Sequence, residues 1–154
     1  MNNLQSIKSA FEEFLLLPAE TEWLEFKVNN YKPEDIGEYI SALSNAASLL
    51  NKPFGYLVFG VEDSNLKIIG TDFKPHNEKV GAQELENWLS TQLNPRIDFR
   101  IFEFTYDEKN IVIFSIDATT NTPVEFRGEG FIRVGSYKKK LKDHPEKARK
   151  IWGK

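Results

Sequence analysis

The sequence contains no cysteine among its 154 residues. This absence excludes a disulfide scaffold, a zinc site with cysteine ligands and a thiol nucleophile. It also agrees with the reducing cytoplasm, which is where we expect the protein to reside. No apolar run approaches the roughly 18 residues that a membrane-spanning helix needs, so we predict no membrane partner.

Common catalytic signatures are missing as well. The sequence has neither a G-x-S-x-G motif nor a P-loop, and nucleotide hydrolysis is therefore disfavoured. Only two histidines occur, His76 in a loop rich in proline and asparagine and His144 at the start of a predicted helix. Neither has a second metal ligand at a useful spacing, so we expect both on the surface.

The charged residues are unevenly distributed along the chain. The net charge of −3 argues against strong, non-specific binding of nucleic acid. From Arg133 to Lys154, however, nine lysines and arginines outnumber two acidic residues, which gives this part a net charge of +7. The rest of the chain carries a net charge of −10. The sequence therefore predicts an acidic body with a basic C-terminal end.

Hydrophobic periodicity predicts four helices, at residues 3–16, 33–50, 85–93 and 144–152. Ser41, Ser44 and Asn45 are expected opposite the apolar stripe of the second helix or at its edge. Short apolar or alternating runs predict strands at residues 22–28, 54–61, 66–70, 97–106, 111–117, 124–126 and 131–134. This order predicts an α+β fold with mixed, largely antiparallel sheets and packed helices.

The composition and length predict one domain over residues 1–154, with a core at about 18–152. Hydrophobic residues make up 40% of the chain and include 12 phenylalanines, enough for a substantial buried core. Whether the domain is excised from a longer protein is left open.

Five separated stretches together carry a family resemblance. In chain order they are E-T-E-W-L-E-F-K (Glu20 to Lys27), I-S-A-L-S-N-A-A, G-Y-L-V-F-G-V-E-D, I-I-G and G-F-I-R-V-G-S. They resemble the Schlafen AlbA-type domain family (Schlafen AlbA_2), which is described as DNA-binding and occurs in bacterial regulators and in Schlafen proteins. The resemblance implies a Schlafen AlbA-like fold that binds DNA or RNA within a transcriptional regulator or a defence protein.

The same resemblance implies a metal-dependent RNase in some members of the family. Their metal-binding acids are two glutamates spaced E-x4-E and an aspartate just after the G-V strand. The matching positions are Glu20, Glu25 and Asp63, which are therefore implied as catalytic residues and as ligands of Mg²⁺ or Mn²⁺. Carboxylates that hold such a cation can stabilise developing charge and position a water in phosphodiester hydrolysis.

A purely structural explanation of these acids is left open. Glu20 and Glu22 could be solvated residues at the beginning of a strand, and Asp63 could cap a turn. Glu25 and Lys27 should share one strand face, because side chains alternate along a strand. Lys27 could then pair with Glu25, neutralise a metal site or contact a phosphate.

A basic loop is the predicted phosphate contact. Arg133 alternates with Ile132 and Val134 and is expected to leave the core face. Gly135 is expected to adopt a positive φ or to allow close approach of the backbone. The other candidate contacts are Tyr137, which could stack on an unpaired base, and Lys138, Lys139 and Lys140, which could neutralise phosphates. A solvated loop that only balances the acidic body is the alternative.

Three functions therefore remain open at the level of the sequence. The first is a nucleic-acid-binding domain that contacts DNA or RNA phosphates through the basic loop. The second is a metal-dependent endoribonuclease, a hydrolase that uses the Glu-Glu-Asp site. The third is a protein-interaction or dimerisation module. A preference for RNA or DNA and the assembly of a homodimer are not decided by the sequence.

Overall fold

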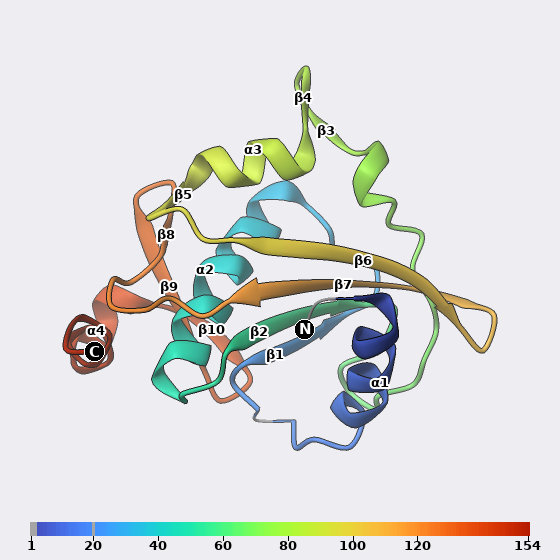
Figure 1. The fold of residues 1–154 in the computed structure, drawn as a ribbon, viewed down its shortest axis with the longest axis horizontal. Helices are drawn as coiled ribbons and strands as arrows, with labels where there is room; N and C mark the ends of the chain where they lie inside the picture. The colour runs from blue at the N-terminus through green and yellow to red at the C-terminus, as the bar shows by residue number, and fades with distance from the viewer. Residues whose placement is uncertain (1–2, 20) are drawn as a thin grey trace.

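The computed structural model describes residues 3–19 and 21–154 (Figure 1). The helices are α1 (Leu4–Phe14), α2 (Pro33–Leu49), α3 (Leu85–Gln92) and α4 (Pro145–Trp152), with 3₁₀ turns η1 (Pro75–Asn77) and η2 (Leu141–Asp143). The strands are β1 (Leu24–Lys27), β2 (Phe54–Phe59), β3 (Lys79–Val80), β4 (Gln83–Glu84), β5 (Leu93–Asn94), β6 (Phe99–Tyr106), β7 (Lys109–Asp117), β8 (Glu125–Phe126), β9 (Glu129–Val134) and β10 (Tyr137–Lys140). All four predicted helices are confirmed. None of the helices described is both long and apolar enough to cross a membrane.

Two four-stranded sheets organise the fold. The central sheet has the strand order β1-β2-β7-β6, and the second sheet has the order β10-β9-β8-β5. Strands β1 and β2 are parallel, because α2 carries the chain back to the start of β2. The pairs β2–β7, β6–β7, β8–β9 and β9–β10 are antiparallel. The predicted α+β class with mixed, largely antiparallel sheets is thus confirmed.

Helices cover both faces of the central sheet. In Figure 1, α1 lies in front of this sheet and α2 lies behind it. Along β2, Tyr56 and Val58 belong to the core beneath α1, while Leu57 and Phe59 belong to the core beneath α2. This arrangement explains why β2 is a continuous apolar run rather than an alternating one.

Helix α2 lies between the two sheets. Its first side packs on β2, and Ala46 on another side packs on Ile132 of β9 and Leu141 of η2. Every residue from Ile40 to Ser48 is consequently buried. Ser41, Ser44 and Asn45, predicted opposite the apolar stripe of the helix or at its edge, are among these buried residues, and all three donate hydrogen bonds to backbone carbonyls of other segments.

Polar side chains of α2 fix the second sheet to the helix. The Asn45 amide accepts a 2.8 Å hydrogen bond from the Val124 N–H and donates one of 2.8 Å to the Phe131 carbonyl. The Ser41 hydroxyl accepts a 3.0 Å bond from the Phe131 N–H and donates one of 2.6 Å to the Val124 carbonyl. These bonds satisfy strand groups that would otherwise be buried without a partner.

Two glycines of ordinary backbone conformation allow these layers to approach closely. A Cβ atom on Gly37 would lie 2.1 Å from Cε1 of Phe126, and one on Gly55 would lie 2.6 Å from the Leu43 carbonyl oxygen. At distances this short, a side chain at either position would force its neighbour to shift. The glycines therefore set the spacing of α2 from β8 and from β2.

Two strand predictions need correction. Residues 66–70 do not form a strand, since a single bridge between Val61 and Ile68 is the pairing found there. The basic segment after Gly135, predicted as a loop, forms strand β10 and pairs antiparallel with β9. Pairing with β9 overrides the low strand propensity of three consecutive lysines, as commonly happens at a sheet edge.

Candidate nucleic-acid interface

Strand β1 presents two charged side chains toward α2. Glu25 is in register with Leu57, whose side chain packs beneath α2, so Glu25 and Lys27 extend from the same face of the sheet. Glu25 Oε2 lies 3.6 Å from Lys27 Nζ. The predicted sharing of one strand face is confirmed.

Arg133 of β9 is the main partner of Glu25. Its Nε donates a 2.7 Å hydrogen bond to Glu25 Oε1. Its Nη1 donates to the carbonyl oxygens of Thr21 and, at 2.9 Å, of Gly135. Glu25 is 4% exposed and Arg133 is 2% exposed. The burial of both charges within one hydrogen-bonded pair is what makes them tolerable in the interior.

The burial of Arg133 corrects one part of the sequence-based prediction. The side chain leaves the face of β9 that packs on α2, as expected from strand alternation. It does not reach an open surface, because the segment that leads into β1 covers it. A direct contact between Arg133 and a phosphate stays a prediction.

The segment that leads into β1 also holds the turn of the β9–β10 hairpin. Gly135 has a φ of +61°, which confirms the predicted positive φ. Its N–H donates a 2.6 Å hydrogen bond to Glu22 Oε2. The ion pair of Arg133 and this bond to Glu22 together attach the hairpin to residues 21–25.

Lys27 and Lys138 meet on the ring of Tyr39 in α2. Their Nζ atoms lie 4.8 Å and 4.6 Å from the ring centre. Lys138 Nζ also forms a 2.5 Å ion pair with Glu38 Oε1. Sequence reasoning missed Tyr39 and Glu38, because no local pattern indicates a contact between residues about a hundred positions apart.

Lys27 keeps its positive charge at this place. Burial by itself lowers the pKa of the ammonium group. The neighbouring Tyr39 phenol and Glu25 carboxylate outweigh burial, and the pKa of Lys27 is raised above its ordinary value.

Strand β10 also carries exposed side chains, which we call the exposed β10 group (Tyr137, Lys139 and Lys140). Tyr137 is 67% exposed, and the Nζ of Lys139 lies 5.5 Å from the centre of its ring. Lys140 Nζ lies 3.8 Å from a carboxylate oxygen of Glu129, but both side chains reach solvent. A pair in such a position is weak. The exposed β10 group is therefore the part of the predicted phosphate contact that a polyanion can reach.

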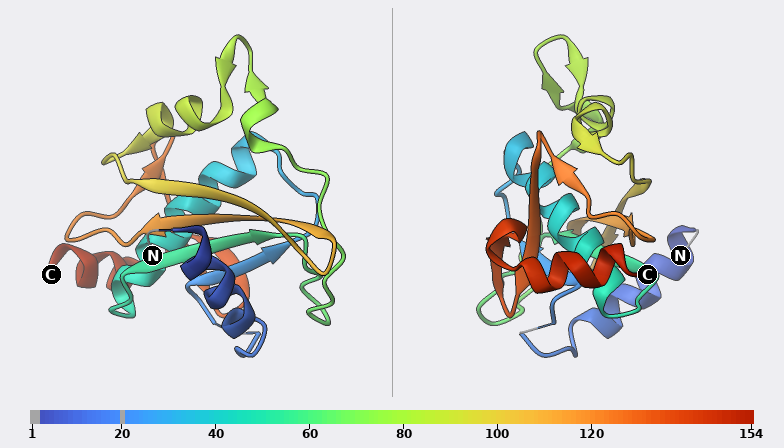
Figure 2. Two further views of the ribbon diagram at one scale, coloured as in Figure 1. Left: turned by 45° about the vertical axis from the view of Figure 1, so that its right-hand side comes forward. Right: turned by 90° about the vertical axis from the view of Figure 1, so that its left-hand side faces the viewer.

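Helix α4 places further cations beside the hairpin. Lys147 and Lys150 line a small hollow of about 140 Å³ together with Glu22 and Arg133. These cations of the basic C-terminal end thus lie beside Arg133 of β9 and beside Glu22 in the segment before β1. Figure 2 shows α4 alongside the second sheet.

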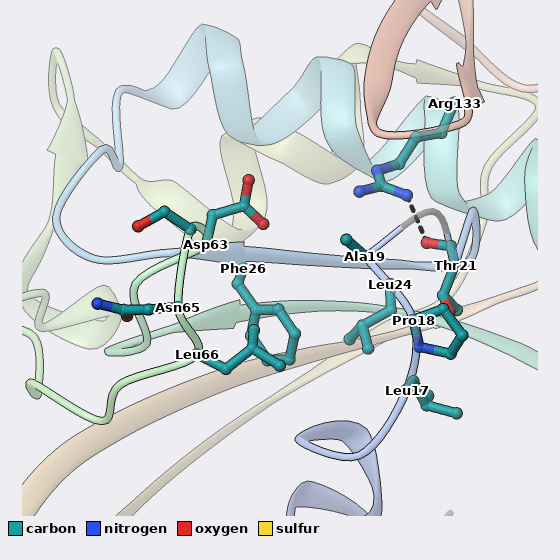
Figure 3. Close-up of a pocket in the computed structure, with 11 residues that line it drawn as sticks. Leu17, Pro18, Ala19, Thr21, Leu24, Phe26, Asp63, Asn65, Leu66 and Arg133 are labelled. Atoms are coloured by element: carbon teal, nitrogen blue, oxygen red, sulfur yellow. Dashed lines mark hydrogen bonds between the residues drawn. The ribbon is translucent and has the colours of Figure 1, made fainter.

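A pocket of about 270 Å³ opens on the other side of Arg133 (Figure 3). Its lining includes the apolar side chains of Leu17, Leu24, Phe26 and Leu66. Asp63 and Arg133 contribute charged groups to the same lining. In Figure 3 the Asp63 carboxylate and the Arg133 guanidinium both lie on the upper side of the residues drawn, with the apolar side chains of Leu17 and Leu66 below them. We call it the β1 pocket.

The predicted metal ligands can be placed only in part. Glu20 lies outside the described residues. Both carboxylate oxygens of Glu25 face cations, namely Arg133 at 2.7 Å and Lys27 at 3.6 Å. Asp63 is exposed in the turn after β2 and lines the β1 pocket, whereas Glu25 does not.

These positions do not fit a divalent cation held by Glu25 and Asp63. Within residues 3–19 and 21–154, no group of three or more acidic or histidine side chains could hold a metal ion. We derive no catalytic step from the described carboxylates. The site for Mg²⁺ or Mn²⁺ and the catalytic roles of Glu20, Glu25 and Asp63 stay predictions, to be tested by the cleavage assay below.

Comparisons with known proteins place the chain in a family. Residues 20–142 match the model of the family described as Schlafen, AlbA_2. No curated protein matches the sequence.

Solved structures share the fold at low sequence identity. The DIP2311 protein of Corynebacterium diphtheriae is 17% identical, with a TM-score of 0.57 over 88% of this chain. The chain spans only 26% of the length of that protein. The N-terminal domain of a RecG-related protein from Nitrosomonas europaea is 18% identical, with a TM-score of 0.51, and the match covers 85% of this chain and 86% of that domain. On the strength of the family match over most of its length, the chain belongs to the Schlafen AlbA_2 family.

Proposed function

We propose that this domain binds nucleic acid and that the exposed β10 group, with the neighbouring cations of α4, contacts backbone phosphates. The observation that carries the proposal is the gathering of lysines on one hairpin and one helix that lie side by side. Neutralisation of phosphates by lysine and arginine supplies most of the affinity that does not depend on sequence.

The pairing pattern decides which side chains are available. Lys27 and Lys138 share Tyr39 and are paired with Glu25 and Glu38. Lys139 has no carboxylate partner among the described residues, and Lys140 has only a distant one. Lys139 and Lys140 can therefore exchange water for phosphate without breaking a strong ion pair.

The relatives support the same function. The chain belongs to the Schlafen AlbA_2 family, whose resemblance implied nucleic-acid binding at the level of the sequence. The name of the Nitrosomonas europaea protein relates it to an ATP-dependent DNA helicase. We extend this association with nucleic acid to the present chain.

Fluorescence anisotropy with labelled RNA and DNA strands tests the proposal. The affinity of the wild-type domain should fall steeply as salt is raised, because bound counterions are released from each neutralised phosphate. The double variant Lys139→Gln/Lys140→Gln should bind about tenfold more weakly and should show a shallower salt dependence. Lys74→Gln/Lys79→Gln provides a matched control, since these exposed lysines lie just before η1 and in β3, two elements that contact α3. Figure 1 shows β3 and α3 away from β10.

The same labelled strands and protein variants distinguish the alternative functions. Cleavage of RNA that needs Mn²⁺ or Mg²⁺, stops with a chelator and disappears in Glu25→Gln would support the endoribonuclease. Binding without cleavage would support the binding domain alone. No binding at low salt, with wild-type and lysine variants alike, would overturn the proposal in favour of a protein-interaction or dimerisation module, and size-exclusion chromatography would then test for a homodimer.

A further inference from the structure

The β1 pocket is built differently from the lysine surface beside it. Most of its lining is apolar, and its volume of about 270 Å³ lies just below the roughly 300–1,000 Å³ of pockets that hold drug-sized ligands. Such a pocket suits one small, flat and largely apolar group. Phosphates do not suit it, because a polyanion gains nothing from an apolar lining.

Arg133 connects this pocket to the phosphate-binding surface. It belongs to β9, the strand that pairs with β10, and it lines the β1 pocket. Lys138 is in register with Arg133, so Lys140 extends from the same side of the hairpin as Arg133. A nucleic-acid strand on Lys140 would therefore pass close to the pocket, and one of its bases could enter while its phosphates stay on the lysines. A base inside a duplex cannot enter in this way, because it is stacked and paired.

Two charged groups in the pocket are positioned to read a base edge. The Asp63 carboxylate can only accept hydrogen bonds, and the Arg133 guanidinium can only donate them. The hydrogen bonds that Arg133 makes to described residues use Nε and Nη1, and none of them uses Nη2. Arg133 is almost fully buried, so its direction is fixed by Glu25 and by two backbone carbonyls.

Guanine matches this pair of groups better than the other bases do. Its Watson–Crick edge places an acceptor, O6, beside two donors, N1–H and the 2-amino group. A carboxylate can accept from both donors at once, and a guanidinium can donate to O6. Adenine and cytosine offer one donor beside an acceptor, and uracil offers one donor between two acceptors.

We infer that the β1 pocket binds a guanine base of a single-stranded nucleic acid, with Asp63 accepting from the base and Arg133 donating to it. This inference rests on the proposed function and specifies its ligand as single strands that contain guanine. It gives Asp63 a role in recognition that does not need a metal ion.

Substitution of guanosine by inosine is the direct test, because inosine lacks only the 2-amino group. Anisotropy is measured with oligouridylate that carries one central guanosine, inosine, adenosine or no replacement, in RNA and in DNA form. The guanosine strand should bind about tenfold more tightly than the inosine strand, in keeping with one well-placed base contact. Asp63→Asn should bring the ratio of the two affinities close to one.

Two more variants serve as a control outside the pocket and as a block of the pocket. Glu86→Gln removes one exposed carboxylate on α3, away from the pocket, and should leave the ratio near tenfold. Ala19→Trp places a large ring in the pocket lining and should lower the affinity for the guanosine strand to that for plain oligouridylate.

Each outcome decides one of the two proposals. Binding of all strands with equal affinity, or a guanosine preference that survives Asp63→Asn, would overturn the guanine pocket and leave the binding function standing. A failure of every strand to bind at low salt would overturn the binding function itself. A duplex that binds as tightly as the guanosine strand would also contradict the pocket, because its bases are not free to enter.

Discussion

The side chains of β9 are mostly buried and those of β10 are mostly exposed, although the two strands of this hairpin are hydrogen-bonded to each other. In β9, Phe131 is held by Asn45 and Ser41, and Arg133 is buried against Glu25. In β10, the side chains of Tyr137, Lys139 and Lys140 are exposed. Basic residues on the two strands therefore have different roles, since Arg133 fixes the hairpin while Lys139 and Lys140 face solvent.

This difference shows why the position of a charge along a chain does not give its role. Arg133 and Lys139 are six residues apart and both belong to the basic C-terminal end. The Arg133 guanidinium is paired with Glu25 and leaves only Nη2 for a ligand, whereas Lys139 has no carboxylate partner among the described residues. Substitutions on each strand test this difference.

The largest effect is expected for Arg133→Met. It leaves Glu25 buried with only the longer contact to Lys27, so the free energy of unfolding should fall by about 3 kcal/mol. Urea denaturation followed by circular dichroism measures this change. The double variant Arg133→Met/Glu25→Gln should recover part of the loss, because it removes the unpaired charge. A loss below about 1 kcal/mol in the single variant would show that the ion pair of Arg133 and Glu25 contributes little to stability.

A smaller loss is expected for Asn45→Ala. The substitution leaves the Val124 N–H without its partner and removes a bond to the Phe131 carbonyl, so stability should fall by about 2 kcal/mol. Hydrogen exchange should also show faster opening of β9 than of β2. Asn87→Ala, on the exposed side of α3, is a matched control that should change stability little. Equal protection of β9 in Asn45→Ala and the wild type would contradict the role of Asn45 in fixing β9 to α2.

Lys138→Gln should distinguish the paired side of β10 from the open side. Its ion pair with Glu38 and its contact with Tyr39 are partly buried, so unfolding free energy should fall by up to about 1 kcal/mol, and less at high salt. Lys139→Gln should leave stability unchanged within error. Denaturation of both variants at low and at high salt measures the difference. Equal effects of the two substitutions would erase the contrast between the sides of the strand.

The smallest effect is expected for Lys27→Met and concerns the stability of the protein at alkaline pH. Because the pKa of Lys27 is raised in the folded state, the folded protein binds this proton more tightly than the unfolded chain does. The contribution of Lys27 is therefore complete below its unfolded pKa of 10.5 and is lost as the pH rises through the folded value. Thermal unfolding from pH 9 to pH 12 should show a smaller decline for Lys27→Met than for the wild type. Parallel declines would contradict the shift.

Much of the fold could be predicted because its signals are local. The helical period placed α1, α2, α3 and α4, and the continuous apolar run of β2 indicated a strand buried on both faces. The segment at 66–70 was wrongly predicted as a strand, because its pairing with residues 60–62 is limited to one bridge. Strand β10 was missed because its three lysines have low strand propensity, and pairing with β9 makes the segment a strand.

The candidate site could be predicted less completely. The pairing of Glu25 with Lys27 followed from strand alternation, and the positive φ of Gly135 followed from its residue type. The burial of Arg133 was not predictable, because its partner Glu25 is 108 positions away in the chain. Tyr39 was missed because the residues of a cation–π contact share no periodic pattern.

The amino-acid sequence alone determined the helices, the main strands, the family resemblance and the basic character of the C-terminal end, since each of these depends on neighbouring residues or on composition. Which charges are paired inside the protein and which remain open to a ligand depends on how the elements pack. The physical reason is that a charge is neutralised by whatever lies within a few ångströms of it in space, and the packing of β9 against β1 and α2 brings those groups together from distant parts of the chain.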